Sequence, residues 1–444
     1  MGKPIIALAT PPLKGALSII RLSGDGVFEL TNRLFDKTIT PEQGRKIYLG
    51  NIKNEVGEPI DQVVVLAYPG PRSMTGEDVV ELIPHGSMII ANQIIQAYLS
   101  LGVNYATRGE FSARAFYNGK MDLIEAEAVN EMINATTIEA KNLALRSLKG
   151  EASELMLPIK EAISSLLALV EVGIDYPEYE DIEEASEIKI AAESQQIRKA
   201  IAKLISQGFE GQIIREGIKL AIVGEPNVGK SSILNALLDE EKAIVSDIPG
   251  TTRDIVEGDI SIKGVPIHLL DTAGIRESED KIEKIGVELS QKSIENADVV
   301  VLVLDACKKQ LSEQEKQIVE KAQNKKLILC YNKDDLLEDK EDGKIYVSAL
   351  NHEIKALKEA IFDSLSLSEE SFSRPSLSNA RQLSLLRQID EALRQAGEDA
   401  ESGLGMDIIS VSLQSAYNKA RELLGEEATN DLSDEIFSRF CVGK

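Results

Sequence analysis

Eight consecutive residues have the types and spacing needed to bind the phosphates of a nucleotide. Residues 224–231 read Gly-Glu-Pro-Asn-Val-Gly-Lys-Ser and fit the phosphate-loop pattern G-x-x-x-x-G-K-[ST]. An apolar run at 218–223 predicts a strand before the loop, and an amphipathic run at 232–238 predicts a helix after it. In such a unit, backbone N–H groups and the helix dipole attract an anion. We expect Lys230 to contact the β- and γ-phosphates and Ser231 to be a Mg²⁺ ligand.

A second segment predicts which base the site selects. It follows the apolar run 327–331, fits N-K-x-D and consists of Asn332, Lys333, Asp334 and Asp335. The Asp335 carboxylate can accept hydrogen bonds from N1–H and the 2-amino group of guanine, a pair that adenine cannot offer. Ser348 and Ala349 follow the strand-like run 344–347 and would close the pocket with a backbone N–H on guanine O6. The wrong base would leave these polar groups buried without partners, so we predict a GTP site.

Two further segments lie between the phosphate loop and the base-selecting segment in the sequence. After the strand-like run 267–270, Asp271 would orient Mg²⁺ through water and the Gly274 N–H would sense the γ-phosphate. In the preceding loop, Thr252 is the second expected Mg²⁺ ligand, engaged once the γ-phosphate is bound. The complete expected GTP-binding set is Asn227, Val228, Gly229, Lys230, Ser231, Ser232, Ser246, Asp247, Ile248, Pro249, Gly250, Thr251, Thr252, Asp271, Thr272, Ala273, Gly274, Asn332, Lys333, Asp335, Ser348 and Ala349.

The residue that orients the attacking water is not evident from these segments. Ile275 stands where many small GTPases have a Gln, and an isoleucine cannot orient water. Asn227 offers an amide oxygen within the phosphate loop, where it could help to bind a monovalent cation with backbone carbonyls of the 246–251 loop. Such a charge would stabilise the developing anion. Two alternatives stay open: Asn227 only stabilises its loop, or Arg253 acts as an arginine finger in trans.

Length and composition limit the possible protein classes. A chain of 444 residues is expected to form two to four domains. The apolar N-terminal run is short and interrupted by proline, and no stretch approaches 18 apolar residues, so we expect neither a signal peptide nor a membrane span. Cys307, Cys330 and Cys441 have no disulfide or metal spacing, which predicts a cytoplasmic protein without a zinc site.

The charge is unevenly distributed along the chain. The net charge is −24, yet residues 1–120 carry 12 Lys+Arg against 11 Asp+Glu, and the remainder carries 37 against 62. Such a surface repels a phosphate backbone over most of its area. If nucleic acid is a substrate, we expect a partner protein or a small local patch to hold it.

The pattern of apolar residues predicts a multidomain chain. Residues 1–119 contain strand-like runs at 5–9, 16–22, 63–68 and 79–82 and a helical run at 87–101, which predicts an α+β domain. Residues 120–216 and 369–444 are rich in helix formers, and 177–184 is expected to be an acidic loop. Residues 217–368 alternate strand and helix, which predicts an α/β P-loop (Ras-like) domain with a parallel sheet. We expect it to be inserted into one all-α helical domain formed by the two helical stretches.

The whole chain resembles the MnmE (TrmE) family of tRNA-modification GTPases, within the cation-activated GTPases of the TrmE-Era-EngA type. The motifs that carry the resemblance are Ala9-Thr10-Pro11-Pro12, Arg21-Leu22-Ser23-Gly24, Thr75-Gly76-Glu77-Asp78, Gly109-Glu110-Phe111-Ser112, Gly250-Thr251-Thr252-Arg253-Asp254 and the final Cys441-Val442-Gly443-Lys444. One departure is Pro84-His85-Gly86-Ser87, where the family commonly has a small residue or cysteine before His-Gly and a second glycine after it.

The resemblance implies a set of sites and partners. It implies that residues 1–119 form a homodimer and bind a 5-formyl- or 5,10-methylene-tetrahydrofolate. The implied folate contacts are Arg21, Glu81, Lys120 and Lys444. Without the resemblance, we would interpret such charged residues beside strand ends as solvated surface. It places K⁺ between Asn227, Ser246, Ile248 and Thr251. It assigns the positioning of the attacking water to Glu283 and a part in the tRNA reaction to Cys441.

The implied function is GTP hydrolysis coupled to a 5-carboxymethylaminomethyl-type modification at C5 of the wobble uridine (position 34) of certain tRNAs. The implied partners are tRNA and the flavoprotein MnmG in a heterotetramer-type complex, with FAD held only by that partner.

The first alternative is a ribosome-assembly GTPase of the Era/EngA type, which would have a basic RNA-binding domain after the GTPase unit. A membrane iron-transport GTPase would need membrane spans, and a scaffold would bind GTP without turnover.

Overall fold

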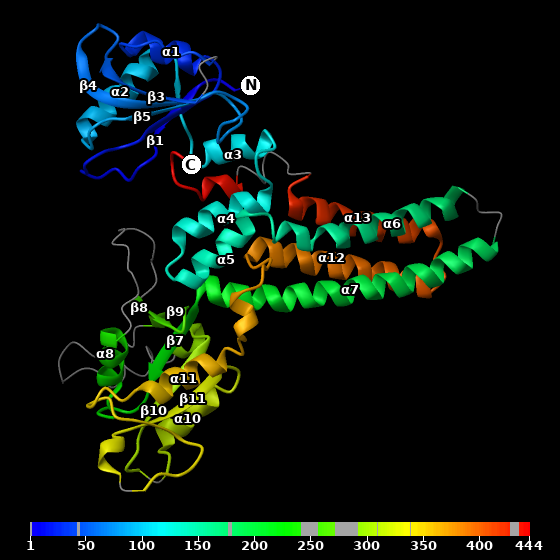
Figure 1. Cartoon of the computed structure of the whole chain (residues 1–444). Coiled ribbons are helices and arrows are strands. Elements are labelled where there is room, and N and C mark those ends of the chain that lie inside the picture. Colours follow the sequence, from blue (N-terminus) through cyan, green and yellow to red (C-terminus); the bar gives the residue numbers. More distant parts are fainter. Residues whose placement is uncertain are drawn as a thin grey trace. The chain divides into compact units, whose positions relative to one another are not determined.

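The computed structural model describes residues 2–41, 45–175, 180–240, 256–270, 292–308, 310–337, 339–426 and 435–444. The expected GTP-binding residues at 246–252 and 271–274, and Glu283, lie outside these ranges. The chain divides into two units, one formed by residues 1–130 with 421–444 and the other by residues 131–420 (Figure 1). None of the described helices is both long and apolar enough to cross a bilayer.

The first unit contains a six-stranded sheet in the order β3-β4-β5-β2-β1-β6. Its strands are β1 (Ile5–Leu8), β2 (Ile20–Ser23), β3 (Lys46–Lys53), β4 (Pro59–Tyr68), β5 (Val79–Ile83) and β6 (Asn104–Tyr105). Neighbouring strands are antiparallel, except that β1 and β6 are parallel. The helices of this part are α1 (Val27–Leu34), α2 (Met88–Ser100), α3 (Glu110–Tyr117) and α4 (Leu123–Asn134).

One face of this sheet is buried beneath α1 and α2. Alternate residues of β4, Val63, Val65 and Ala67, lie in the same apolar cluster as Phe28 of α1 and Tyr98 of α2. Val64 and Leu66 of β4 point to the other face and are only partly buried. On this second face Ile5 and Ala7 of β1 are buried against Phe111 of α3, so the face is covered at β1, whereas at β4 it is only partly buried.

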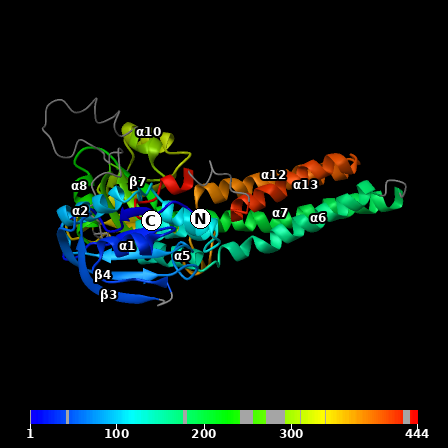
Figure 2. The ribbon, with the colours of Figure 1, turned by 90° about the horizontal axis from the view of Figure 1, so that it is seen from above.

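The second unit contains long helices that pack side by side. They are α6 (Leu157–Asp175), α7 (Glu180–Glu216), α12 (Ala380–Glu401) and α13 (Met406–Leu424, whose last residues belong to the first unit), and both views show them as a bundle (Figures 1 and 2). The shorter α5 (Ile138–Leu148) and a 3₁₀ turn at Ser153–Leu155 precede them. In α12, Leu386, Ile389 and Leu393 recur at helical spacing and are fully buried.

Residues between α7 and α12 form a second six-stranded sheet in the order β12-β11-β10-β7-β9-β8. Its strands are β7 (Ile218–Val223), β8 (Val256–Ile262), β9 (Val265–Leu270), β10 (Val299–Asp305), β11 (Lys326–Asn332) and β12 (Ile345–Val347), all parallel to their neighbours except β8. The helices beside it are α8 (Lys230–Glu240), α10 (Glu313–Lys321) and α11 (Lys355–Ser364), with short 3₁₀ turns at Asp334–Leu336 and Glu369–Phe372.

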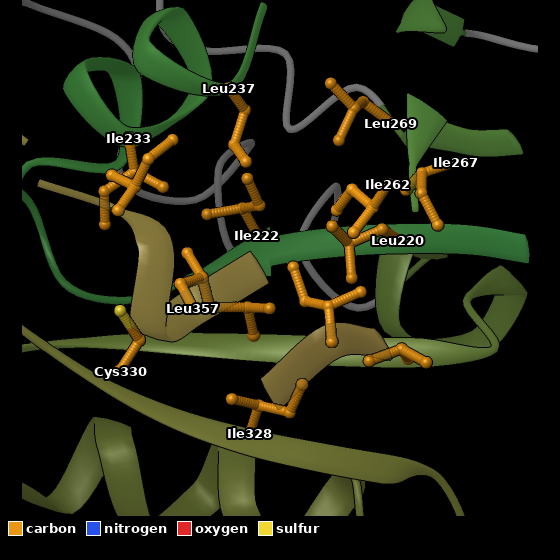
Figure 3. Close-up of a cluster of buried hydrophobic side chains, with 14 of the residues drawn as sticks. Leu220, Ile222, Ile233, Leu237, Ile262, Ile267, Leu269, Ile328, Cys330 and Leu357 are labelled. Atoms are coloured by element: carbon orange, nitrogen blue, oxygen red, sulfur yellow. The ribbon is translucent and has the colours of Figure 1, made fainter. Parts of the chain in front are cut away.

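Both faces of the second sheet are buried. On β10, Val299, Val301 and Val303 belong to one apolar cluster, whereas Val300, Leu302 and Leu304 belong to another, as the two-residue period of a strand requires. Figure 3 shows the first cluster, in which strand side chains face Ile233 and Leu237 of α8 and Leu357 of α11. This packing holds the ends of the parallel strands in fixed positions.

The expected fold class is confirmed: the chain combines an α+β N-terminal part, helices, and an α/β part inserted between α7 and α12. The domain boundaries at 119, 216 and 368 stay a prediction. One local expectation was wrong, because residues 180–184 begin α7 instead of forming a loop. Strand β3 and helix α1 were not predicted.

Candidate nucleotide-binding site

The segments expected to bind the nucleotide meet at the carboxyl edge of the second sheet. Asp305, the last residue of β10, is paired with Asn332, the last residue of β11, and Asn332 is paired with Val347 at the end of β12. Strand β7 ends at Val223, directly before the phosphate loop. Because these strands are parallel, their carboxyl ends lie along one edge, where α/β sheets bind their ligands.

Two glycines allow the phosphate loop to lie close to its neighbours. Gly224 has φ +152°, and a Cβ there would lie 2.4 Å from the Val303 carbonyl oxygen. Gly229 has φ +97°, and its Cβ would lie 2.1 Å from Asn332 Nδ2. Both positions therefore need glycine for backbone conformation and for space.

The lysine of the loop is held by backbone oxygens. Lys230 is the first residue of α8, and its Nζ donates to the carbonyls of Gly224 at 3.0 Å and Glu225 at 2.7 Å. Burial lowers the pKa of Lys230, and the nearby charge of Glu225 opposes this effect. The ammonium group is thus placed over the loop opening, where phosphate oxygens could replace the two carbonyls as acceptors.

The loop is also fixed by an ion pair between Glu225 and Lys308. Hydrogen bonds from Lys308 and Ser312 hold the pKa of Glu225 below its usual value. Glu225 is therefore an anion that ties the loop to the segment after β10. Sequence reasoning gave Glu225 and Lys308 no role.

The base-selecting segments are connected to the phosphate loop through Asn332. Its Nδ2 donates to the Val228 carbonyl at 2.8 Å, and its Oδ1 accepts from the Ala349 N–H at 3.1 Å. The side chain is buried, so both bonds are shielded from water. The structure thus brings together three expected segments: the loop, the N-K-x-D segment and the Ser348-Ala349 turn.

Asp335 and Ser348 are likewise in direct contact. The Ser348 hydroxyl donates to Asp335 Oδ1 at 2.7 Å, which fixes one carboxylate oxygen. Lys333, in the left-handed region at φ 70°, forms an ion pair with Asp305 at 2.7 Å. Although burial acts in the opposite direction, the hydrogen bond from Lys333 holds the pKa of Asp305 below its usual value. Asp305 was not predicted as a site residue. The sequence feature that could have identified it is an acidic residue directly after the apolar run 299–304.

The remaining expected residues of the loop lie on its accessible side. Asn227 is exposed with φ 63°, and its side chain has no hydrogen-bond partner within the described residues. Ser231 is half-buried and Ser232 exposed in the first turn of α8. Across the ranges that the structure describes, no group of three or more His, Cys, Asp or Glu could hold a metal ion.

The residues expected to bind folate form a cluster in the first unit. Arg21 on β2 is paired in register with Glu81 on β5, and their side chains form an ion pair at 2.8 Å. Arg21 Nη1 also donates to the Gly443 carbonyl at 2.9 Å. Burial and the charge of Arg21 lower the pKa of Lys444. Three of the four expected residues, Arg21, Glu81 and Lys444, are thus neighbours.

The fourth residue, Lys120, makes a different contact, because its Nζ donates to the Pro71 carbonyl at 3.0 Å. Tyr68, which was not predicted as a site residue, lies between Glu81 and the loop that contains Pro71. Its hydroxyl lies 3.5 Å from Glu81 Oε2, and burial and Glu81 raise the pKa of the phenol. Tyr68 is the last residue of β4, directly before the loop that contains Pro71.

The C-terminal residues pack on the first unit. Val442 forms a β-bridge with Arg108, and Gly443 has φ +91°, with Leu8 and Ala9 so close that a Cβ would lie 2.6 Å from the Leu8 carbonyl. Cys441 is exposed and has a free thiol, and its carbonyl accepts from the Gly109 N–H at 3.4 Å. The Cys-x-Gly-Lys ending is therefore a fixed part of this unit.

A mostly parallel sheet with a phosphate loop and an N-K-x-D segment on its carboxyl edge defines a P-loop GTPase domain. Family models narrow this class: the MnmE helical domain matches residues 123–441, and the N-terminus of the GTP-binding protein TrmE matches residues 4–120. The chain belongs to the MnmE family of tRNA modification GTPases.

Individual relatives are similar over the full length. A curated tRNA modification GTPase MnmE from Ligilactobacillus salivarius (strain UCC118) is 40% identical over 457 residues, which cover 99% of this chain and 98% of the relative. The MnmE of Listeria welshimeri is 39% identical over 454 residues, covering 99% of both chains. Among solved structures, Era from Aquifex aeolicus is 29% identical over 39% of this chain and 66% of its own, with a TM-score of 0.26, too low to carry a conclusion.

Proposed function

We propose that this chain is a K⁺-dependent GTPase that drives the 5-carboxymethylaminomethyl-type modification at C5 of wobble uridine 34 in certain tRNAs. It acts with a flavoprotein of the MnmG kind, which holds FAD, and takes the one-carbon unit from a tetrahydrofolate. Family membership supports the tRNA reaction. The observation that carries the nucleotide part is the buried Asn332 side chain, which links the phosphate loop to the Ala349 N–H.

In this proposal the described residues bind and orient GTP. The Lys230 ammonium exchanges two loop carbonyls for phosphate oxygens, while the N-terminus of α8 faces the same anion. Asp335, fixed on one oxygen by Ser348, accepts from the guanine N1–H and 2-amino group. The Ala349 segment, fixed by Asn332, closes the pocket at O6. GTP would thus be bound at its phosphates and at its base by segments that are hydrogen-bonded to one another.

Metal ions would be held by residues on the open side of the loop. Ser231 would hold Mg²⁺ with Thr252, and Mg²⁺ when bound neutralises charge between the β- and γ-phosphates. Asn227 would hold K⁺ with Ser246, Ile248 and Thr251. The exposed Asn227 amide, which has no hydrogen-bond partner within the described residues, fits that role because its oxygen is free to coordinate a hard cation. Glu283 is proposed to position the attacking water.

A tetrahydrofolate would bind at the Arg21 cluster. Burial and, to a smaller extent, the nearby charge of Arg21 lower the pKa of Lys444, and Glu81 already accepts from Arg21. A carboxylate of the ligand would relieve the repulsion, while Glu81 could accept from a pterin N–H. Cys441, whose backbone is fixed beside Gly109, would place its exposed thiol at the same end of the unit.

Exposed apolar residues support the proposal that the first unit forms a homodimer. On the edge strand β3, Ile47 is 74% exposed and Leu49 is 55% exposed. Their partners in register are Leu66 and Val64 of β4, so the four side chains share one face of the β3–β4 pair. Contiguous apolar surface of this kind is typical of protein–protein interfaces.

The proposed function is tested by reconstituting the reaction. The chain, its flavoprotein partner, unmodified tRNA, methylenetetrahydrofolate and the amine donor are incubated in K⁺, and nucleosides of the tRNA are measured by mass spectrometry. We expect modified uridine at position 34 with GTP and none with a non-hydrolysable analogue. Equal yield with the analogue, or a product at another position, would contradict the proposal.

A further inference from the structure

Three cationic side chains gather on the loop that follows Tyr68. Lys120 Nζ donates to the Pro71 carbonyl at 3.0 Å, and Arg45 Nε donates to the next carbonyl, that of Arg72, at 3.2 Å. Arg72 itself is exposed. Within the described part of the chain, no carboxylate forms an ion pair with Arg45, Arg72 or Lys120. We call these three residues the cation cluster.

The cation cluster is held in place by backbone contacts. The stem of Lys120 lies against Gly76, where a Cβ would be 3.3 Å from Lys120 Cδ. Asp78, the carboxylate that contacts this loop, accepts from the Gly70 N–H at 2.8 Å and so supports the backbone of the loop. Two of the cations are therefore oriented before any ligand binds, which reduces the entropy lost on binding.

The cation cluster continues the proposed folate site. Tyr68 joins them, because its hydroxyl contacts Glu81 and its phenol experiences the charges of both Arg21 and Arg45. Lys120 belongs both to the expected folate contacts and to the cluster. A ligand that begins at Arg21 and Glu81 and extends past Tyr68 would reach the cluster with its far end.

We propose that Arg45, Arg72 and Lys120 bind the γ-linked glutamyl tail of tetrahydrofolate, so that the chain prefers polyglutamylated over monoglutamylated folates. This inference rests on the proposed folate site. Each added glutamate brings one carboxylate, and each finds a cation with which no carboxylate among the described residues forms an ion pair. An RNA phosphate backbone is disfavoured as the ligand, because such binding needs a longer series of contacts than three cations provide.

The expected gain is moderate because the cluster is exposed. One exposed ion pair contributes about 1.4- to 5-fold in affinity. Two additional pairs are therefore expected to make a triglutamate on the order of tenfold tighter than a monoglutamate. Salt should reduce the preference, since exposed pairs are screened.

The test is calorimetric titration of the full chain with the mono- and triglutamate forms of 5-formyltetrahydrofolate. We expect the wild type to bind the triglutamate about tenfold tighter. In the double variant Arg45→Ala/Arg72→Ala the ratio of the two affinities should fall toward one. Arg33→Ala, which removes an exposed cation from α1, is the matched control and should keep the ratio. Thermal unfolding shows whether each variant is folded.

Four other results of these titrations would overturn the inference or part of it. Equal affinity of the wild type for both forms would overturn the inference while leaving the folate site intact. A preference that survives in the double variant would overturn the assignment to the cation cluster. Absence of any folate binding would overturn the proposed folate function and the inference with it. If the double variant instead loses only affinity for unmodified tRNA, the cluster is an RNA contact and the inference is wrong.

Discussion

Asn332 donates from its side chain to the Val228 carbonyl at 2.8 Å and thereby joins the end of β11 to the phosphate loop. The same side chain accepts from the Ala349 N–H, so one buried amide supports both ends of the nucleotide site. The close approach also explains Gly229, because a Cβ there would collide with Asn332 Nδ2.

Replacing Asn332 with alanine should leave the Val228 carbonyl and the Ala349 N–H buried without this partner. We expect a loss of about 1–3 kcal/mol in unfolding free energy and a 10- to 100-fold weaker affinity for GTP, on the order of one lost buried bond. Chemical denaturation and titration with a fluorescent GTP analogue measure the two effects. Asn332→Asp keeps the acceptor for the Ala349 N–H but sets a carboxylate oxygen against the Val228 carbonyl oxygen, so it should lose at least as much as the alanine variant. Unchanged GTP affinity in the alanine variant would refute the linking role.

Asp335→Asn should change which base the site prefers. The variant presents a donor to the guanine 2-amino group, whereas xanthine has an oxygen there that can accept. GTP affinity should fall by about 100-fold and XTP affinity should rise, since mispaired buried groups are costly. Competition titrations with GTP, XTP and ATP measure this. Ser348→Ala, which removes the hydrogen bond to Asp335 but keeps the carboxylate, should retain guanine preference. If GTP still binds at wild-type strength in Asp335→Asn, the base-pocket assignment is incorrect.

His268 should make stability depend on pH. Its Nδ1 lies 2.7 Å from Asp259 Oδ1 and its Nε2 lies 2.8 Å from the Glu216 carbonyl, at the end of α7. The hydrogen bond with Asp259 raises the pKa of His268 above its usual value, although burial opposes it, and the Glu216 carbonyl adds to the increase. Because the folded-state pKa is raised, the stabilisation is complete below the unfolded value and is lost as pH rises through the folded value.

The measurement is urea unfolding of wild type and His268→Gln between about pH 5.5 and 8.5. The difference in unfolding free energy should be largest at the acidic end and shrink as the pH increases. His85→Gln is a suitable control, because His85 also contacts an aspartate, Asp61, but its side chain is 68% exposed. A difference that grows with pH would show that neutral His268 is the stabilising form.

The C-terminal residues should affect folate binding and not GTP turnover. Lys444→Ala removes a half-buried cation beside Arg21, while Arg21→Gln removes the donor to Gly443 and the partner of Glu81. We expect about tenfold weaker binding of 5-formyltetrahydrofolate in each, comparable to one charged hydrogen bond. Lys37→Ala, an exposed cation elsewhere in the unit, should have no effect. A parallel loss of GTP hydrolysis would contradict separate sites.

The strongest local patterns were sufficient to predict the nucleotide-binding part of the fold. The apolar runs 218–223, 267–270 and 327–331 lie in strands β7, β9 and β11, and the phosphate loop stands between β7 and α8 as its pattern requires. Strand β3 was not predicted, because the residues that alternate with Ile47 and Leu49 are of types that are also common in loops. Both apolar side chains are exposed. Its position is determined by pairing with β4, which is information from distant residues.

The parts of the site that were missed depend on three-dimensional contacts. The sequence shows Asp305 as the end of a strand, but its ion pair with Lys333 exists only because β10 and β11 are parallel neighbours. Likewise, Arg45 and Lys120 are far apart in sequence and meet on one loop. Acidic residues 180–184 looked like a loop because of their charge, yet their backbone is the start of a 37-residue helix.

The most direct test of the central claim is the rate of nucleotide hydrolysis by the full chain in KCl and in NaCl, with GTP and with ATP. We predict hydrolysis of GTP alone, much faster in K⁺ than in Na⁺, with the K⁺ stimulation lost in Asn227→Ala while GTP binding is retained. Equal and negligible rates in both salts, or ATP hydrolysed as fast as GTP, would contradict the account.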